Sequence, residues 1–227
     1  MTTSHQPLQA GDIAPEFALP AINRDGTVSL SALRAKGPVL LALMRGLHCP
    51  FCRRQLASLA TTRDKLAREG VETLAVVVTP MQRARQYFQY RPTPVVLASD
   101  PEVTTHRAFG LLETAMLPDD ANASDVHWPQ TVTLQQLMNT SVQSDELPAP
   151  MNLMAAAEAL NTRDGYEMTE ADQQTFATHG MQWAGQFLID TTGTIRWAYV
   201  EAPDSPNQYG HVPNDEEILA AARSAHH

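Results

Sequence analysis

The stretch GPVLLALMRGLHCPFCRR (residues 37–54) joins a run of apolar residues to the two cysteines of the chain. The run over 37–45 is continuous and is bounded by glycine and proline, which predicts a strand buried on both faces. Pro50 fits the first turn of a helix, because a proline lacks an N–H that would have no partner there. This stretch therefore predicts a buried strand, a CxxC segment and a helix that begins beside Cys49.

The predicted start of the helix gives Cys49 a chemical role. Unpaired backbone N–H groups and the helix dipole stabilise a thiolate at this point and lower the pKa of the thiol. Cys52 lies one turn later on the same face, at a spacing that suits the Cα separation of a disulfide. We therefore expect Cys49 to attack a substrate and Cys52 to resolve the product as an intramolecular disulfide.

Basic residues surround the cysteine pair in the sequence. Arg45, Arg53 and Arg54 are expected to add positive potential, and Arg45 would bind an anionic or peroxide oxygen or solvate the end of the strand. His48 would add charge if it were protonated, or it would shuttle a proton. Arg45 and His48 are therefore the candidate supporting residues of the site.

Two other interpretations of the cysteine pair stay open at this point. A zinc site needs about four ligands, whereas the chain offers one CxxC and scattered histidines, so no metal site is predicted. Two buried structural thiols are the second alternative. The strand–CxxC–helix context favours the redox interpretation over both.

Four histidines without recognisable partners are expected at the surface, namely His106, His127, His179 and His211.

The segments that follow the cysteines alternate between patterns typical of helices and patterns typical of strands. A turn at RDG (24–26) predicts an N-terminal hairpin. Alternation of strands and helices implies a mainly parallel sheet covered by helices. The expected helices lie at 53–70, 81–91 and 101–111, the last with Pro101 near its start, and the expected strands lie at 71–79 and 93–100.

The pattern breaks over residues 112–182, where no convincing buried strand is found. This segment is interpreted as a helical insertion or lid, with helices over 149–165 and 169–180. The turn DTTG then predicts a hairpin within 185–201, and Asn214 is expected to cap a closing helix over 213–225. We expect one domain over 1–227 that contains this insertion.

The composition indicates an ordinary globular chain, with 43% apolar and 18% charged residues and a net charge of −9. The acidic balance argues against nucleic acid or an anionic membrane as a partner. We expect no signal peptide in the first twelve residues, which lack a basic start followed by an apolar run, and the run at 38–44 is too short to span a bilayer. We expect a cytoplasmic protein, in which a close cysteine pair is catalytic or metal-binding rather than a permanent disulfide.

Several motifs resemble the peroxiredoxins of the alkyl hydroperoxide reductase/thiol-specific antioxidant (AhpC/TSA) superfamily. GDIAPEFALP and VSLSAL resemble the opening of these proteins, and MRGLHCPFCRRQL resembles the peroxiredoxin-like branch of the superfamily. GQFLIDTTGTIRWAYV resembles the late hairpin. The resemblance covers about 11–111 and 183–225. Where typical members carry proline and Thr or Ser before the attacking cysteine, this chain has Ala42 and Gly46.

The resemblance implies a thioredoxin-like α/β fold, with Cys49 as the attacking cysteine and Cys52 as its partner. It implies reduction of a small peroxide or disulfide without a bound cofactor, with regeneration by a thioredoxin-, glutaredoxin- or glutathione-type reductant. A homodimer stays open. We therefore hypothesise a thiol-dependent peroxidase with an antioxidant role. The alternatives are a disulfide reductase that acts on proteins and a slow redox-sensing or binding module in which 112–182 presents the partner surface.

Overall fold

The central sheet has five strands in the order β5-β4-β3-β8-β9. The computed structural model describes residues 6–144 and 146–224. β3 pairs in parallel with β4, and β4 with β5, whereas β8 is antiparallel to both β3 and β9. This is the thioredoxin-like α/β fold that the resemblance implies, but the sheet is mixed rather than mainly parallel, because β8 and β9 return as an antiparallel hairpin. The strands are β3 (Val39–Met44), β4 (Glu72–Val77), β5 (Val96–Ser99), β8 (Gly185–Ile189) and β9 (Ile195–Val200).

The central strand β3 is buried on both faces, as predicted. Successive side chains of a strand point to opposite faces of the sheet. Leu40 and Met44 accordingly belong to one apolar cluster, and Leu41 and Leu43 belong to the other. The apolar run at 38–44 therefore supplies both layers of the core.

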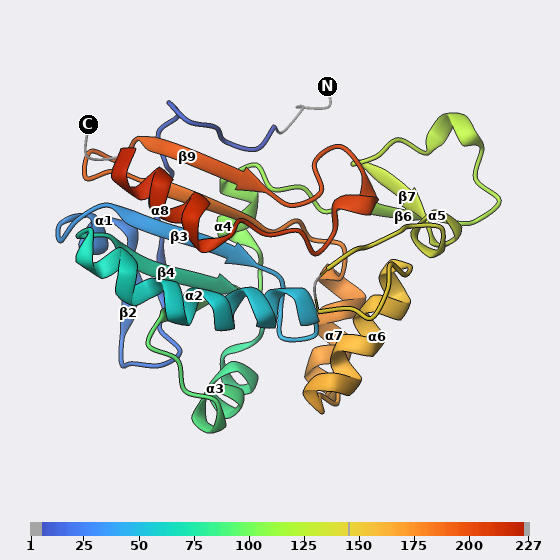
Figure 1. The fold of residues 1–227 in the computed structure, drawn as a ribbon, viewed down its shortest axis with the longest axis horizontal. Coiled ribbons are helices and arrows are strands. Elements are labelled where there is room, and N and C mark those ends of the chain that lie inside the picture. Colours follow the sequence, from blue (N-terminus) through green and yellow to red (C-terminus); the bar gives the residue numbers. More distant parts are fainter. Residues whose placement is uncertain (1–5, 145, 225–227) are drawn as a thin grey trace.

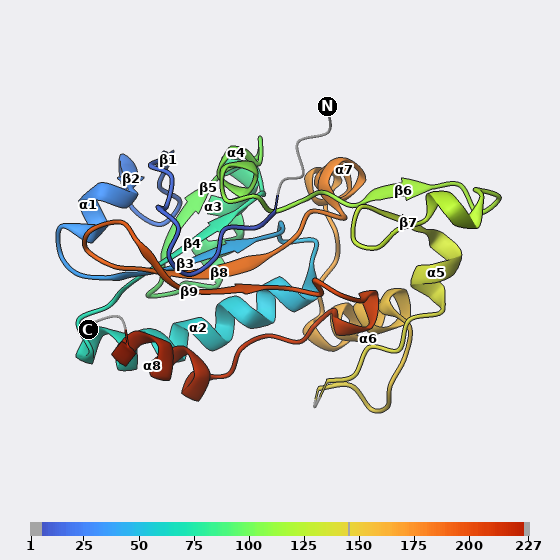
Figure 2. The same ribbon diagram turned by 90° about the horizontal axis from the view of Figure 1, so that it is seen from above.

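Helices cover the sheet on both faces, and Figure 2 shows α2 and α8 on one face and the N-terminal hairpin, α1 and α4 on the other. Apolar side chains of α2, α3 and α8 join the Leu40 cluster, which places the helix after the CxxC segment directly on the sheet. The helices are α1 (Leu30–Arg34), α2 (Pro50–Arg68), α3 (Met81–Tyr90), α4 (Thr104–Ala108) and α8 (Asp215–Ser224).

The N-terminal hairpin forms as predicted, with β1 (Ala18–Pro20) antiparallel to β2 (Thr27–Ser29). Gly26 at the turn adopts φ 81°, a conformation that glycine tolerates without steric cost. α1 begins at Leu30, directly after the second strand, because the Ser29 side chain accepts a hydrogen bond from the Ala32 N–H and caps the helix.

The helix after β5 begins later than the sequence indicates. We expect it over 101–111 with Pro101 near its start, whereas α4 begins at Thr104. The Asp100 carboxylate accepts hydrogen bonds from the backbone N–H groups of Thr104 and Thr105. This side chain sets the start of the helix, and Pro101 lies in the turn before it.

The segment 112–182 lies beyond the end of the sheet toward which β3 points (Figure 1). Its helices at 149–165 and 169–180 are confirmed as α6 and α7, with Gly165 and Thr169 as their caps. It also contains two short strands that pair in parallel, which the sequence does not indicate. The elements are β6 (Ala115–Leu117), the 3-10 turn η1 (Ala123–Asp125), β7 (Thr131–Thr133), α5 (Leu134–Met138), α6 (Leu153–Asp164) and α7 (Glu170–His179).

The chain closes with the predicted hairpin of β8 and β9, a 3-10 turn η2 (Pro206–Gln208), and α8. Asn214 accepts a hydrogen bond from the Glu217 N–H and so caps α8 as expected. The last residue of the predicted helix, Ala225, lies outside the described residues. In the described part of the chain, no helix has both the length and the apolar character needed to cross a membrane.

Candidate active site

The two cysteines lie where β3 ends and α2 begins, as the sequence predicts. Cys49 is the N-cap residue of α2, with φ −84° and ψ 110°, and Pro50 is the first helical residue. The Cys49 sulfur accepts a hydrogen bond from the Cys52 backbone N–H at 3.3 Å. Both thiols are free, and their exposed fractions are 6% for Cys49 and 4% for Cys52. An attacking sulfur at this position receives a backbone donor directly.

Arg45 contacts the same sulfur from the end of β3. Its Nε donates to the Cys49 sulfur at 3.4 Å, and its Nη1 donates to the Gln182 carbonyl at 3.0 Å. Its Nη2 forms an ion pair with Glu201, and both side chains are buried. The guanidinium also lies 5.2 Å from the centre of the Tyr209 ring. Arg45 is therefore held by three protein groups while it donates to the thiol.

These contacts separate the pKa values of the two thiols. Burial opposes ionisation of Cys49, but the hydrogen bond with Cys52 and the charge of Arg45 outweigh it and lower the pKa of Cys49 to about 6. The hydrogen bond with Cys49 raises the pKa of Cys52 well above its ordinary value, and burial acts in the same direction. At neutral pH, Cys49 is the thiolate of the pair and Cys52 is the thiol.

His48 lies beside the pair, but it carries no positive charge at neutral pH. Burial and the charge of Arg45 lower its pKa to about 3. The side chain is 5% exposed, and both ring nitrogens lack a hydrogen-bond partner among the described residues. Its ring meets Phe176 edge-on at 5.6 Å between ring centres. Of the two expected roles, the low pKa disfavours a positive charge on His48, and the proton-shuttle role stays a prediction.

Arg53 and Arg54, which the sequence predicts to add positive potential near the cysteines, bond to the backbone before α2 and to α6. Arg53 donates to the Leu47 carbonyl at 2.6 Å and to Asn161 at 2.7 Å, and its guanidinium lies 3.7 Å from the centre of the Tyr166 ring. Arg54 pairs with Asp164. Both arginines therefore connect α2 to α6.

Sequence reasoning misses Gln182, Glu201 and Tyr209, which hold Arg45. They come from the segments next to β8 and β9, far from Arg45 along the chain. No local motif marks them. The available signal is topological, because β8 pairs with β3, which brings residues beside β8 to the end of β3 where Arg45 lies.

The expected surface position of His106 is wrong. It is fully buried in α4, and its Nε2 lies 3.1 Å from the Met44 carbonyl oxygen. His127 and His211 are exposed as expected, and His179 is half-buried. Within 6–144 and 146–224, no group of three or more His, Cys, Asp or Glu side chains has a geometry for a metal ion.

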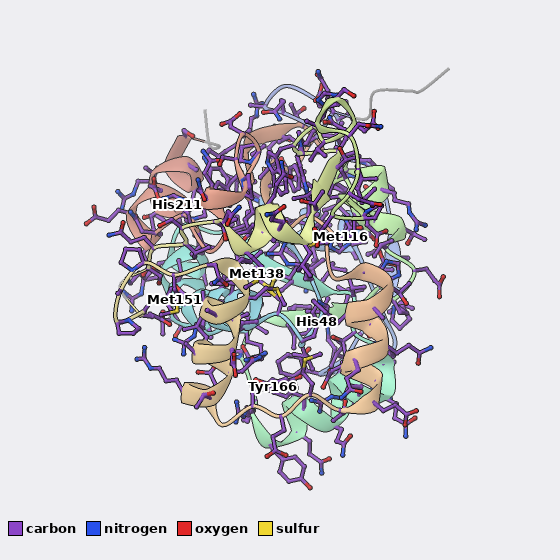
Figure 3. The ribbon with its side chains drawn as sticks, turned by 90° about the vertical axis from the view of Figure 1, so that its right-hand side faces the viewer. His48, Met116, Met138, Met151, Tyr166 and His211 are labelled. Atoms are coloured by element: carbon purple, nitrogen blue, oxygen red, sulfur yellow. The ribbon has the colours of Figure 1, made fainter. Side chains whose placement is uncertain are left out.

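A cleft of about 1250 Å³ opens over Cys49, lined by residues from α5, α6, α7 and the strand end that carries Arg45. Figure 3 looks into it: His48 lies between α6 and α7, with Met116 and Met138 above and Tyr166 below. The lining is mostly apolar and includes Met116, Met154 and Phe176. The segment 112–182 therefore forms most of the wall of the candidate active site.

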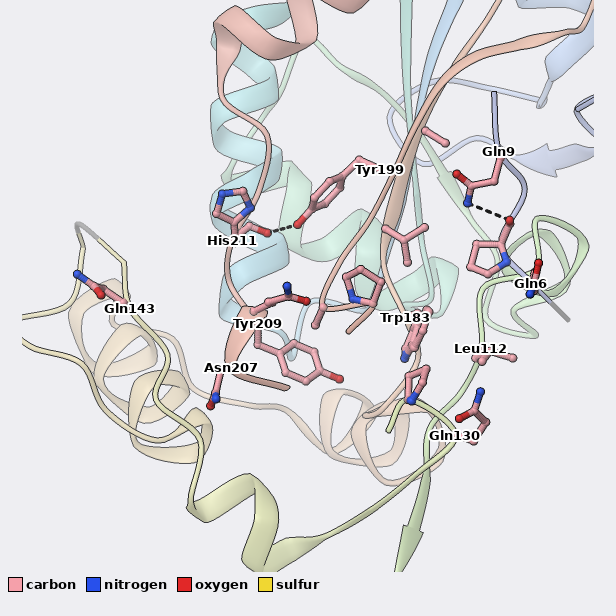
Figure 4. A pocket seen from close by; sticks show the side chains of 17 residues that line it. Gln6, Gln9, Leu112, Gln130, Gln143, Trp183, Tyr199, Asn207, Tyr209 and His211 are labelled. Carbon is pink, nitrogen blue, oxygen red and sulfur yellow. Dashed lines mark hydrogen bonds between the residues drawn. The ribbon is translucent and has the colours of Figure 1, made fainter. Parts of the chain in front are cut away.

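A second groove, of about 990 Å³, is lined by several amide side chains together with Trp183 and Tyr199 (Figure 4). Tyr209 lines this groove as well as the cleft over Cys49. Its hydroxyl is buried and has no hydrogen-bond partner among the described residues. The aromatic ring beneath Arg45 therefore belongs to the walls of two openings.

Comparison with known proteins places these features in context. A sequence profile described as the AhpC/TSA family matches residues 10–198, including the segment 112–182. The chain is 29% identical over 106 residues to peroxiredoxin Bcp of Escherichia coli K12. That match covers 46% of this chain and 66% of the relative, so it spans slightly less than two thirds of the relative's length.

Solved structures resemble the whole described fold. Peroxidoxin BcpB of Mycobacterium tuberculosis has 16% identity and a TM-score of 0.55, over 96% of this chain and 97% of its own. A reduced 2-Cys peroxiredoxin of Plasmodium vivax has 16% identity and a TM-score of 0.57, over 97% and 83%. A Chlorobium tepidum protein described as a thiol:disulfide interchange protein DsbE has 19% identity and a TM-score of 0.50, over 95% and 99%. At these identities the likenesses show the fold alone.

Proposed function

Because the chain belongs to the AhpC/TSA family, we propose that it is a thiol-dependent peroxidase in which Cys49 reduces a peroxide. The observation that carries the proposal is the environment of the Cys49 sulfur. This sulfur caps a helix, accepts hydrogen bonds from the Cys52 N–H and from Arg45, and has a pKa of about 6. A thiolate at neutral pH is the nucleophile that such chemistry requires.

The proposed cycle has three steps. The Cys49 thiolate attacks a peroxide oxygen, the O–O bond breaks, and the sulfur is oxidised to a sulfenic acid while the leaving alkoxide or hydroxide takes a proton. The Cys52 thiol then condenses with the sulfenic acid, which forms the S–S bond and releases water. An external dithiol reduces this disulfide by thiol–disulfide exchange and is itself oxidised to a disulfide.

Arg45 and His48 support these steps without reacting. Arg45 stabilises the thiolate and the negative charge that develops on the leaving oxygen, because its guanidinium stays charged and is held in place by Glu201. His48 borders the cleft with two unpartnered nitrogens and offers a hydrogen bond to the bound peroxide. Both roles follow from their position beside the sulfur.

The cycle suits a reducing compartment, so we propose a cytoplasmic protein with an antioxidant role. A thioredoxin-, glutaredoxin- or glutathione-type dithiol or thiol would regenerate the pair. A homodimer stays a prediction, which sedimentation of the full chain would test.

Peroxide consumption by two cysteine variants tests the proposal. Cys49→Ser should abolish turnover. Cys52→Ser should still form a sulfenic acid, detectable by dimedone labelling, but should form no intramolecular disulfide. Unchanged peroxide consumption in Cys49→Ser would refute the mechanism.

Reduction of protein disulfides is a second candidate function. It is favoured by the CxxC spacing and by the volume of the cleft over Cys49. In this reaction the Cys49 thiolate attacks a disulfide sulfur, and no peroxide takes part. Competition between hydrogen peroxide and a disulfide-bonded protein for the reduced enzyme separates the two candidates: the true substrate suppresses reaction with the other.

A further inference from the structure

The cleft over Cys49 exposes an unusual share of the large apolar side chains. Of the seven that are exposed in the described residues, four line this cleft, with exposed fractions of 40% to 47%. These four are Met116, Leu134, Met154 and Phe176. Methionine is flexible and polarizable, and such side chains adapt to varied apolar surfaces. A concentration of exposed apolar area at one opening marks an interaction site.

The charges around the cleft are mainly negative. Glu113, Glu158 and Glu167 line it, and the latter two form no ion pair with any described residue. Arg45 is the guanidinium among the lining residues, and its charge is paired with Glu201. Since the Cys49 thiolate adds a further negative charge, an anionic occupant is disfavoured and a neutral or cationic one is favoured.

His48 provides an independent observation that points to a ligand. Its side chain is 5% exposed, borders the cleft, and has both ring nitrogens without a partner among the described residues. A neutral imidazole presents one donor and one acceptor. An extended peptide carries carbonyl and N–H groups that can pair with an imidazole nitrogen, whereas a hydrocarbon chain carries neither.

We infer that the cleft docks an apolar polypeptide segment that carries positive charge, presented by a protein redox partner of the Cys49–Cys52 pair. Its volume of about 1250 Å³ exceeds the roughly 300–1,000 Å³ of ordinary small-molecule sites and accommodates several side chains. The assignment of the partner as a redox protein rests on the proposed function. The docking itself rests on the apolar lining, the carboxylates and His48.

Fluorescence anisotropy with the reduced full chain tests the docking directly. The probes are two short peptides rich in Leu and Ala that carry an uncharged dye, one with Lys at each end and one with Glu. The Lys-ended peptide should bind about tenfold more tightly than the Glu-ended peptide, because only the former complements the carboxylates. Added salt should reduce this difference, because exposed charges are screened.

Variants then locate the binding surface. The double variant Met116→Gln with Met154→Gln keeps the size of the side chains but removes apolar contact, and it should weaken peptide binding about tenfold. Ile13→Asn is the matched control, because Ile13 is 68% exposed and does not line the cleft. Glu158→Lys should remove the preference for the Lys-ended peptide, whereas Glu102→Lys, outside the cleft, should preserve it. Circular dichroism confirms that each variant is folded.

Equal binding of the two peptides, or no binding by the Lys-ended peptide, would overturn the inference. A second combination of results would also overturn it: no peptide binds, the protein reacts saturably with a neutral organic hydroperoxide, and the methionine variants impair that reaction. The cleft would then be a small-molecule site. Binding is measured without turnover. If no peptide binds but hydrogen peroxide is consumed normally, the peroxidase proposal is therefore unaffected. If a peptide binds but peroxidase activity is absent, the docking inference is unaffected.

Discussion

The planar guanidinium of Arg45 connects the Cys49 sulfur to Glu201, which follows the edge strand β9. Each side of its guanidinium has a different partner, namely the Cys49 sulfur, the Gln182 carbonyl and the Glu201 carboxylate. Two ions that are buried together stay charged because they pair with each other and with further polar groups. The geometry therefore fixes the donor that faces Cys49 more firmly than a flexible lysine would.

Replacement of Arg45 by Lys should therefore raise the pKa of Cys49 above about 6, because the positive charge remains but the directed Nε hydrogen bond is lost. Each pKa unit gained above neutral pH lowers the thiolate fraction about tenfold. The measurement is the pH dependence of Cys49 alkylation by iodoacetamide, compared between Cys52→Ala alone and Cys52→Ala with Arg45→Lys, because loss of the Cys52 side chain itself shifts the pKa of Cys49. Arg54→Lys is the control, since Arg54 pairs with Asp164, and an unchanged profile in Arg45→Lys would contradict the assigned role.

Gly46 leaves space that His48 and Thr79 occupy. A Cβ atom at this position would lie 2.8 Å from His48 Nδ1 and 3.0 Å from the Thr79 hydroxyl. The Thr79 hydroxyl in turn accepts a hydrogen bond from the Leu47 N–H at 2.8 Å. The chain therefore has no room here for the Thr or Ser side chain of typical peroxiredoxins.

Gly46→Ala should destabilise the protein by about 1–3 kcal/mol, because an added methyl group in a packed site forces its neighbours to move. Urea denaturation measures this change. Adding His48→Ala should restore part of the lost stability by removing the nearest clash. A single variant as stable as the parent chain would show that His48 does not pack against Gly46.

A buried carboxylate, that of Asp172, connects α7 to α3. Asp172 accepts hydrogen bonds from Arg83 on α3, from the Tyr166 hydroxyl and from the Thr169 N–H. It also closes the capping box of α7 with Thr169. The same side chain therefore starts the helix and connects the cleft wall to the layer that covers the sheet.

Asp172→Asn should loosen α7 and destabilise the protein by about 2 kcal/mol, because a neutral amide cannot replace the charge-assisted bonds to Arg83. The measurements are urea denaturation and the rate of proteolysis within 112–182. Asp64→Asn is the matched control, since its ion pair with Arg63 is exposed and such pairs contribute little. Equal effects of the two substitutions would contradict this account.

The elements that the sequence predicts well are those with local causes. The apolar run of β3, the proline after Cys49 and the Gly165 terminus of α6, with φ 57°, are all local signals. The start of α4 is missed although its cause is local, because Pro101 indicates an earlier start than the one that the Asp100 side chain sets. The parallel pair of β6 and β7 is missed because it joins strands that residues 118–130 separate in the chain.

The same division applies to the site as a whole. The cysteines, Arg45 and their position at a helix start are predictable because they are neighbours in the sequence. Glu201 reaches Arg45 across 156 positions of chain, and no spacing rule connects them. The burial of His106 is likewise a property of the assembled molecule, because its partner is the backbone of β3. Sequence motifs therefore identify the candidate nucleophile and Arg45, but not the distant groups that hold Arg45 in place.

Two buried histidines among the described residues, His48 and His106, make the stability of the protein sensitive to acid. Burial lowers the pKa of His48 to about 3 and of His106 to about 4, below the ordinary value of 6.5. Between those values the unfolded chain binds protons that the folded chain excludes. The free energy of unfolding therefore falls as the pH drops below about 6.5.

Each histidine should lower the free energy of unfolding by about 2 kcal/mol between pH 7 and pH 5. Urea denaturation at both pH values measures the sum. His106→Gln should reduce the pH dependence by about the contribution of one histidine, whereas His127→Gln, at an exposed position, should leave it unchanged. Loss of the Cys49 thiolate acts in the same direction above pH 6, so the difference between the two variants isolates His106. Stability that stays constant from pH 7 to pH 5 would contradict the neutral, buried state of both histidines, and with it the assignment of His48 as an uncharged group beside the thiolate.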